Sequence, residues 1–188
     1  MGAMRPMARI DRSRQAIHDA LDATTARLRS LAAQGRYVIG KYLYLRGRKD
    51  HARARDTFLA LRKEFPDSEF AHAALYDLAA AWHGLKDETK TREALDAYLQ
   101  GAKNPVSAAS AYAWFCFKHG FQPARGIEVA REALQKAPDD DGLWDTLAEL
   151  YAATGQPARA REAIARALAL KPKDPYYQQQ LKKFETGR

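Results

Sequence analysis

The side chains that could carry chemistry in this sequence are two histidines and one cysteine. His83 and His119 lie at nearly equivalent places in successive segments, an arrangement that would suit an acid–base pair or part of a metal site. No third ligand follows at a fitting spacing, so we interpret both as surface histidines. Cys116 lies among aromatic residues without an adjacent cation or base that would activate a thiol. We therefore expect Cys116 to be an inert core residue.

The motifs of the common enzyme classes are missing from the sequence. It has no glycine-rich phosphate loop, no paired-carboxylate motif and no nucleophile elbow. A single cysteine forms neither an internal disulfide nor a cysteine metal cluster. We expect no catalytic activity, no cofactor and no bound metal, which leaves binding as the function to look for.

The composition predicts one folded, helical unit. The chain has 188 residues, of which 46% are hydrophobic, and Ala, Leu, Arg and Lys dominate without any alternating run of β-branched residues. Its apolar runs are too short for a membrane span, and its N-terminus lacks the apolar core of a signal peptide. We expect a cytoplasmic location, or a periplasmic one if a leader has been removed. A non-catalytic domain cut from a larger envelope or multidomain protein is the alternative.

A repeat of 34 residues runs through the sequence. The tetrapeptide Gln-Pro-Ala-Arg occurs at 122–125 and again at 156–159, and this spacing is the length of one helix-turn-helix unit. In the last copy the large apolar positions are Trp144, Leu147, Tyr151 and Ile164, and the small ones are Ala148 and Ala160. The small residues let two antiparallel helices approach closely, and the large ones form an apolar face that only a neighbouring copy can cover.

This last copy resembles a tetratricopeptide repeat (TPR) at nearly every signature position, and the preceding copies resemble it less closely. The resemblance implies an all-α fold, a right-handed α-solenoid of about four helix-turn-helix units. The units are expected at about 35–68, 72–105, 107–140 and 141–174, between an N-terminal basic capping helix in 1–34 and a C-terminal capping helix in 175–188. The segment Phe-Pro-Asp-Ser-Glu-Phe at 65–70 is also similar to TPR proteins of bacterial envelope-assembly systems.

Two copies depart from the pattern where their helices should cross. In the copy at 107–140, Trp114 takes the first small-residue position and Gly126 takes the second. We interpret this pair as a large-for-small exchange between the two helices. In the copy at 35–68, the bulky Tyr42 takes the first small-residue position.

The TPR resemblance also implies a binding site. In that family the first helix of each unit lines a groove that holds an extended peptide or a partner helix. The family's groove positions fall on Arg36, Ile39, Leu43, Arg46, Tyr76, His83, Phe115, Lys118, His119, Asp145 and Glu149. The variant that clamps a carboxylate has Lys and Asn where this sequence has Ile39 and Leu43, so we expect no such clamp. Tyr76 and Phe115 are expected to be aromatic anchors.

Basic charge is concentrated in the N-terminal third. Residues 1–63 hold 15 Lys and Arg against 5 Asp and Glu, a net +10, whereas residues 64–188 hold 16 against 18, a net −2. The basic third suits an acidic protein partner. Nucleic acid or an anionic membrane surface is the alternative, with less support because few aromatic residues for base stacking lie among the arginines.

Helices at both ends are expected to cover the repeats. The N-terminal segment carries Ile17, Leu21, Leu28 and Leu31 on one helical face, and the C-terminal segment carries Tyr177, Leu181 and Phe184. An open stack of repeats needs such caps. Because the N-terminal face also approximates two to three heptads, we expect a monomer or a weak homo-oligomer formed through this helix.

Overall fold

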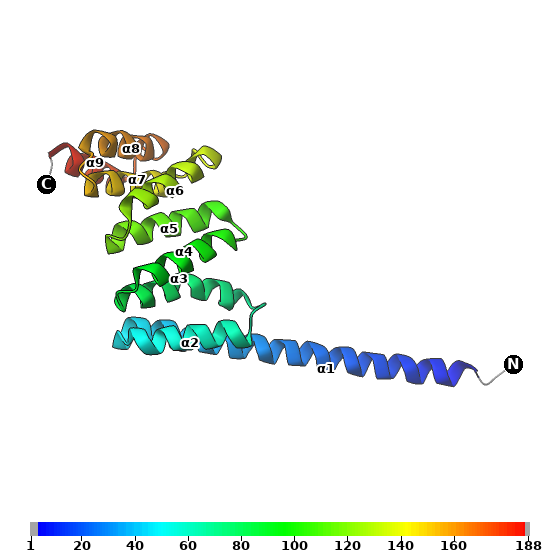
Figure 1. Ribbon diagram of the computed structural model, residues 1–188. Helices are drawn as coiled ribbons and strands as arrows, with labels where there is room; N and C mark the ends of the chain where they lie inside the picture. Colours follow the sequence, from blue (N-terminus) through cyan, green and yellow to red (C-terminus); the bar gives the residue numbers. More distant parts are fainter. Residues whose placement is uncertain (1–3, 187–188) are drawn as a thin grey trace. The chain divides into compact units, whose positions relative to one another are not determined.

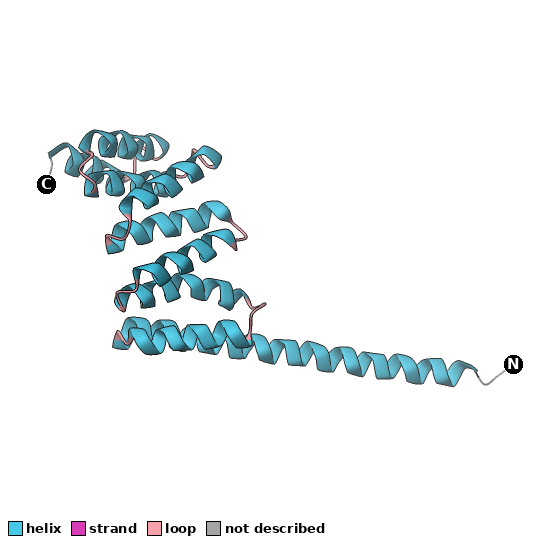
Figure 2. Cartoon of the chain, viewed as in Figure 1, coloured by secondary structure: helices cyan, strands magenta, loops and turns pink. Residues whose placement is uncertain are grey.

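The computed structural model describes residues 4–186, with side chains described for residues 14–185. These residues form α-helices and one π-helical stretch, without strands (Figure 2). The elements are α1 (Met4–Val38), η1 (Ile39–Arg48), α2 (His51–Glu64), α3 (Glu69–Gly84), α4 (Glu88–Gln100), α5 (Pro105–His119), α6 (Pro123–Lys136), α7 (Asp141–Ala153), α8 (Pro157–Leu170) and α9 (Pro175–Thr186). The expected all-α fold is confirmed. The chain divides into two compact units, Met1–Ala97 (unit 1) and Tyr98–Arg188 (unit 2).

The helices begin and end where the local sequence dictates. Side chains that accept a hydrogen bond from a backbone N–H of the first turn include those of Asp50, Ser68, Asp87, Asn104, Asp140 and Asp174. Such N-caps satisfy donors that have no partner within the helix. Proline occupies the first turn of α5, α6 and α8, where its missing N–H costs nothing. The chain turns through the left-handed conformation at Lys49, Lys86, Gly120 and Gly155.

In unit 1, η1 continues α1 and packs against α2, which packs against α3 (Figure 1). A π-helix has more residues per turn than an α-helix. Because each turn of η1 holds more residues, the residue of this helix that faces α2 is Gly40 and not Tyr42. A Cβ on Gly40 would lie only 2.6 Å from Cε1 of Phe58, whereas Tyr42 is 55% exposed. The expected place of Tyr42 at the helix crossing is therefore wrong.

The N-terminal helix is longer and less covered than expected. The boundary expected at residue 34 falls inside α1, and the chain stays helical from Met4 to Arg48. With no turn to fold it back, the N-terminal part of α1 extends beyond α2 (Figure 1). The four residues of its apolar face, Ile17, Leu21, Leu28 and Leu31, are 54–62% exposed. This exposure disagrees with the capping role expected of this helix.

In unit 2, α5 packs with α6 and α7 packs with α8. Helix α7 also packs against α5 and α6, and α9 packs against α8. Ala148 and Ala160 are fully buried, as the close approach of α7 and α8 requires. Helix α9 buries Tyr177 and Phe184.

The expected pairing of Trp114 with Gly126 is also wrong. Trp114 is 42% exposed, and a Cβ on Gly126 would instead lie 2.7 Å from Cβ of Cys116. The left-handed Gly120 and Gly155 are 35 positions apart, although the prolines that open α6 and α8 are 34 apart. The turn after α5 therefore holds one extra residue. Equivalent positions of α5 and α7 are therefore 35 residues apart. Ala113, which is fully buried, takes the small-residue position of α5 that Ala148 takes in α7.

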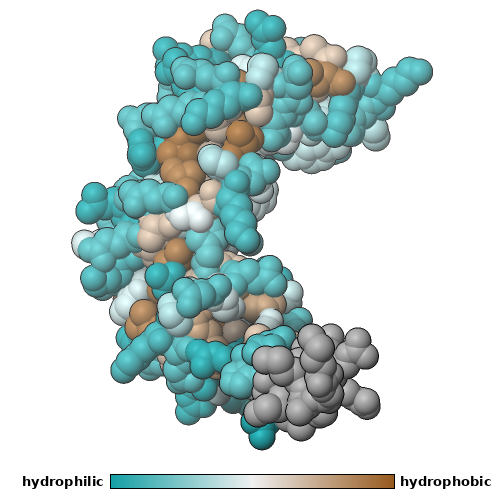
Figure 3. Space-filling model, turned by 90° about the vertical axis from the view of Figure 1, so that its right-hand side faces the viewer, coloured by the Kyte–Doolittle hydropathy of each residue, from teal (hydrophilic) through white to brown (hydrophobic). Residues whose placement is uncertain are grey.

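On the face shown in Figure 3, most residues are hydrophilic and the hydrophobic ones form separate patches. Within residues 4–186, no helix combines the length and the apolar character that crossing a membrane requires.

Candidate functional site

Unit 1 presents an exposed apolar patch where α1 passes into η1. Ile39 and Leu43, both expected in the groove, are 46% and 40% exposed. Val38 and Tyr42 are exposed beside them, and these four residues are called the α1–η1 patch below. The guanidinium of Arg46 lies 5.4 Å from the ring centroid of Tyr42, so a cation borders the patch.

A partly buried polar cluster fixes the opposite side of this helix. The hydroxyl of Tyr37 donates to Oδ2 of Asp77 at 2.8 Å, and Nζ of Lys41 lies 3.2 Å from the same oxygen. Lys41 also donates to the Tyr37 hydroxyl at 2.8 Å. Burial acts to lower the pKa of Lys41, but the hydrogen bond to Tyr37 and the charge of Asp77 outweigh it, so the pKa is raised. These contacts tie α1 and η1 to α3 and hold the patch outward.

The other groove positions of unit 1 have their own contacts. Arg36 forms an ion pair with Glu64, and its guanidinium lies 5.5 Å from the ring centroid of Phe65. Tyr76 and His83 on α3 are half-buried. Burial is the largest cause that lowers the pKa of His83, and the charges of Lys86 and His51 lower it further.

In unit 2 the expected aromatic anchor is a core residue. Phe115 is fully buried, because the extra residue after α5 rotates it to the position that the buried Leu150 takes in α7. His119 stacks on it with ring centroids 4.3 Å apart, while Lys118 is exposed. The same shift places the exposed Trp114 where α7 has Glu149. With one extra residue allowed in the turn after α5, the sequence alone predicts Trp114 at the groove position that Glu149 takes in α7.

Asp145 and Glu149 are covered by the C-terminal helix. The Tyr176 hydroxyl donates to Oδ2 of Asp145 at 3.0 Å, and Nζ of Lys183 lies 2.5 Å from Oε1 of Glu149. Burial raises the pKa of Asp145. Both acids are under 9% exposed, so the expectation that they face a partner is corrected: α9 occupies this surface.

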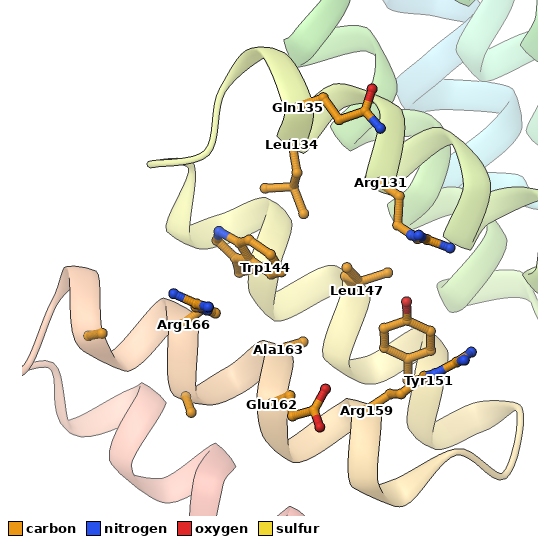
Figure 4. Close-up of a pocket in the computed structure, with 12 residues that line it drawn as sticks. Arg131, Leu134, Gln135, Trp144, Leu147, Tyr151, Arg159, Glu162, Ala163 and Arg166 are labelled. Atoms are coloured by element: carbon orange, nitrogen blue, oxygen red, sulfur yellow. The ribbon is translucent and has the colours of Figure 1, made fainter.

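Unit 2 holds a pocket of about 850 Å³ that the sequence did not predict. Helix α6 forms one wall with Arg131, Leu134 and Gln135, and α8 forms the other with Arg159, Glu162, Ala163, Ala165, Arg166 and Ala169 (Figure 4). Helix α7 forms the floor with Trp144, Leu147 and Tyr151. These three belong to the apolar face expected to need a neighbouring copy. Because α6 and α8 stand apart above α7, that face is only partly covered, and we call the space the α6–α8 pocket.

The pocket combines an apolar floor with arginine-rich walls. Nε1 of Trp144 donates to the carbonyl of Pro138 at 2.8 Å, so its polar atom is already satisfied. Arg159 donates to Oε1 of Gln156 at 2.7 Å and lies 5.8 Å from the Tyr151 ring centroid. Within the part of the chain whose side chains are described, Arg131 and Arg166 have no ion pair or side-chain hydrogen bond. The sequence did not indicate a basic site here, because residues 64–188 as a whole have a net charge of only −2.

The arrangement of these residues suits binding. Cys116 is fully buried against Gly126, as expected of a core residue. In the described residues, no three His, Cys, Asp or Glu side chains gather as ligands for a metal ion. Among the described residues, the α1–η1 patch and the α6–α8 pocket are two surfaces open to a ligand.

Comparisons with known proteins place these helices in a family. Two family models, both described as tetratricopeptide repeat, match residues 37–68 and 121–183. No curated protein matches the chain.

Solved structures show the same fold. MamA from Desulfovibrio magneticus RS-1, residues 41 to the end, is 20% identical, with a TM-score of 0.59 over 82% of this chain and 84% of that one. A MamA RS-1 ArsTM double mutant matches over the same shares at 21% identity and a TM-score of 0.58. Pseudomonas aeruginosa pilF is 19% identical, with a TM-score of 0.61 over 85% of this chain and 70% of that one. At these identities the likeness concerns the fold alone.

Proposed function

The chain is a tetratricopeptide-repeat protein, and from this we propose that it is a non-catalytic scaffold that binds a segment of a partner protein on the α1–η1 patch. Proteins of this family serve as interaction scaffolds, which supports the general role. The observation that carries the specific proposal is the exposure of Val38, Ile39, Tyr42 and Leu43 on adjacent turns. Contiguous apolar surface on a soluble protein commonly marks an interaction site.

The local chemistry supports a protein partner. Aromatic and arginine side chains contribute most to protein interfaces, and Tyr42 and Arg46 provide one of each in contact. The Tyr37, Lys41 and Asp77 cluster orders the helix before a partner arrives, so little conformational entropy is lost on binding. The partner segment would lay apolar side chains on Ile39 and Leu43 and place an acidic group near Arg46.

Ion pairs weaken the alternative of nucleic-acid binding through the basic N-terminal third. Arg36 pairs with Glu64, Arg53 with Asp50 and Arg55 with Asp56. Arg62 donates to the carbonyl of Ala71. Each such contact reduces the charge available to phosphates, on which nonspecific affinity for nucleic acid depends.

Photo-crosslinking from the patch tests the proposal. Tyr42 is replaced by a benzoyl-phenylalanine, the protein is irradiated in nuclease-treated extract of the source organism, and adducts are identified by mass spectrometry. The Ile39→Ser/Leu43→Ser variant should lose the adducts. The matched control Ile17→Ser/Leu21→Ser changes the same two residue types at exposed positions of α1 outside the patch and should keep them.

The outcomes separate the two functions. A protein adduct that disappears only in the patch variant supports the scaffold. Adducts that survive in both variants, or that vanish on nuclease treatment, would contradict binding at the patch and return attention to the basic surface.

A further inference from the structure

We propose that the α6–α8 pocket is a second binding site, which takes an acidic segment of a partner protein carrying apolar side chains between its carboxylates. This site lies in unit 2 and shares no residue with the α1–η1 patch. Its walls come from α6 and α8, the second helices of their repeats, and its floor from a face of α7 that carries neither of the expected groove positions Asp145 and Glu149. The proposal therefore stands apart from the proposed function.

The pocket has more positive than negative side chains, so it favours a ligand with negative charge. Three arginines and one glutamate line the pocket, which leaves a formal surplus of two positive charges. Arg131 on α6 and Arg166 on α8 stand on opposite walls (Figure 4). A guanidinium holds a carboxylate through two parallel hydrogen bonds, and this geometry favours acidic groups on both sides of a bound segment.

The floor selects an apolar side chain between those acidic groups. Leu134 and Leu147 border the half-buried ring of Trp144, whose Nε1 is already hydrogen-bonded. A ligand gains only apolar contact from this ring and leaves no donor unpaired. The Tyr151 hydroxyl points toward the wall that carries Arg131 (Figure 4). The volume of about 850 Å³ is in the usual range of small-ligand sites, which leaves room for a short stretch of a peptide.

A protein segment fits this pocket better than nucleic acid does. Nucleic-acid binding draws its affinity from many phosphate contacts along a track, and this pocket offers three cations around one cavity. A second copy of this chain is also disfavoured, because the exposed face of its α1 would bring Arg27 and Arg29 toward the pocket's arginines.

Fluorescence anisotropy with defined peptides tests the site. The probe is the fluorescein-labelled peptide Asp-Glu-Asp-Phe-Leu-Asp-Glu-Asp, titrated with the full chain. Two comparison probes are the same peptide with a Ser-Ser centre and a labelled single-stranded oligonucleotide of the same length. The variant Arg166→Glu reverses one pocket charge. Its matched control Arg161→Glu makes the same change at an exposed residue on α8 outside the pocket.

The proposal predicts a pattern that general charge attraction does not produce. Arg166→Glu should weaken binding of the Phe-Leu peptide at least about tenfold, and Arg161→Glu by less than about twofold. The Ser-Ser peptide should bind wild type at least about tenfold more weakly than the Phe-Leu peptide. Circular dichroism confirms the fold of each variant, and Arg166→Gln replaces Arg166→Glu if the reversal unfolds the chain.

Three results would overturn the proposal. Equal losses in both variants would show that charge alone attracts the peptide. Equal affinity for the Ser-Ser peptide would show that the floor is not used. Tighter binding of the oligonucleotide, with the same dependence on Arg166, would make the pocket a phosphate site.

Discussion

At the scale of single residues, Gly126 shows how closely α5 and α6 approach. Replacing glycine by alanine inside a helix ordinarily stabilises it by about 1 kcal/mol. At Gly126 the new Cβ would lie 2.7 Å from Cβ of Cys116 and 3.2 Å from Cδ1 of Leu150. The backbones must then move apart, so we expect Gly126→Ala to lower the free energy of unfolding by about 1–3 kcal/mol in urea denaturation.

Gly142 provides the matched control for that substitution. It lies in the first turn of α7, where a new Cβ would meet only Oδ1 of Asp140, at 3.5 Å. Gly142→Ala should therefore leave stability unchanged or raise it slightly. If Gly126→Ala and Gly142→Ala change the free energy of unfolding by the same amount, the close approach of α5 and α6 at Gly126 is wrong.

His83 makes the stability of unit 1 depend on pH. Its folded-state pKa is lowered, chiefly by burial, so the unfolded chain takes up this proton at a higher pH than the folded chain. The neutral ring's contribution is complete above the unfolded pKa of about 6.5 and is lost as the pH falls below it. We expect His83→Gln to flatten the fall in the unfolding free energy between pH 7 and pH 5.

Lys86 offers an independent check on that slope. Its charge is the second cause that lowers the pKa of His83, so Lys86→Gln should flatten the slope partly. A slope that neither substitution changes would mean that another group governs this pH range. Chemical denaturation at each pH gives the measurement for wild type and both variants.

At the scale of helices, the α5 register gives a sharp prediction. Ala113 is fully buried and Trp114 is exposed, the reverse of what the 34-residue spacing predicts. Ala113→Leu should overpack the crossing with α6 and cost about 1–3 kcal/mol of unfolding free energy. Trp114→Ala should cost about 1 kcal/mol or less, since it loses mainly the contact with Phe117, whose ring centroid is 5.4 Å away.

The same experiment distinguishes the two registers. Under the 34-residue spacing Trp114→Ala would empty a core position and cost about 3–5 kcal/mol, while Ala113→Leu would be tolerated. Comparing the two melting curves therefore decides between the registers without a further structure.

The sequence predicted where the helices lie and which of them pair better than it predicted which face of each helix is buried. Hydrophobic spacing and the 34-residue repeat located most of the elements, and Ala148 with Ala160 marked one crossing correctly. One extra residue before Pro123 and the π-helical turns of η1 rotate two helices, and neither feature has a strong sequence signal. Tyr42 and Phe115 were misplaced for these reasons.

The candidate site was predicted only in part. Ile39, Leu43 and Arg46 lie exposed, which agrees with the positions that the TPR resemblance implies, and their role in binding stays a prediction. Asp145 and Glu149 carry the right residue types, yet α9 covers them, which spacing within the repeats does not reveal. The pocket depends on the separation of α6 and α8, a tertiary feature that no local pattern encodes.

At the scale of the whole molecule, stability is concentrated in two units, and the described N-terminal part of α1 adds little to either. Every residue from Arg14 to Ala32 is exposed, so this segment buries little apolar surface in the described chain. An isolated helix of this length is only marginally stable in water. We expect deletion of residues 1–24, which leaves the contact of Arg29 with Phe65 intact, to change the unfolding free energy by less than about 0.5 kcal/mol.

Hydrogen exchange extends that prediction to individual amides. Opening α1 at its N-terminal part breaks only local hydrogen bonds, whereas opening α2 exposes the buried Phe58 and Leu61. Amides of residues 14–28 should therefore exchange orders of magnitude faster than those of α2. Equal protection would contradict an uncovered helix, and it would point to a second copy of the chain on the face of Ile17 and Leu21. Repeating the exchange at lower protein concentration would then decide, because protection that comes from a second copy is lost on dilution.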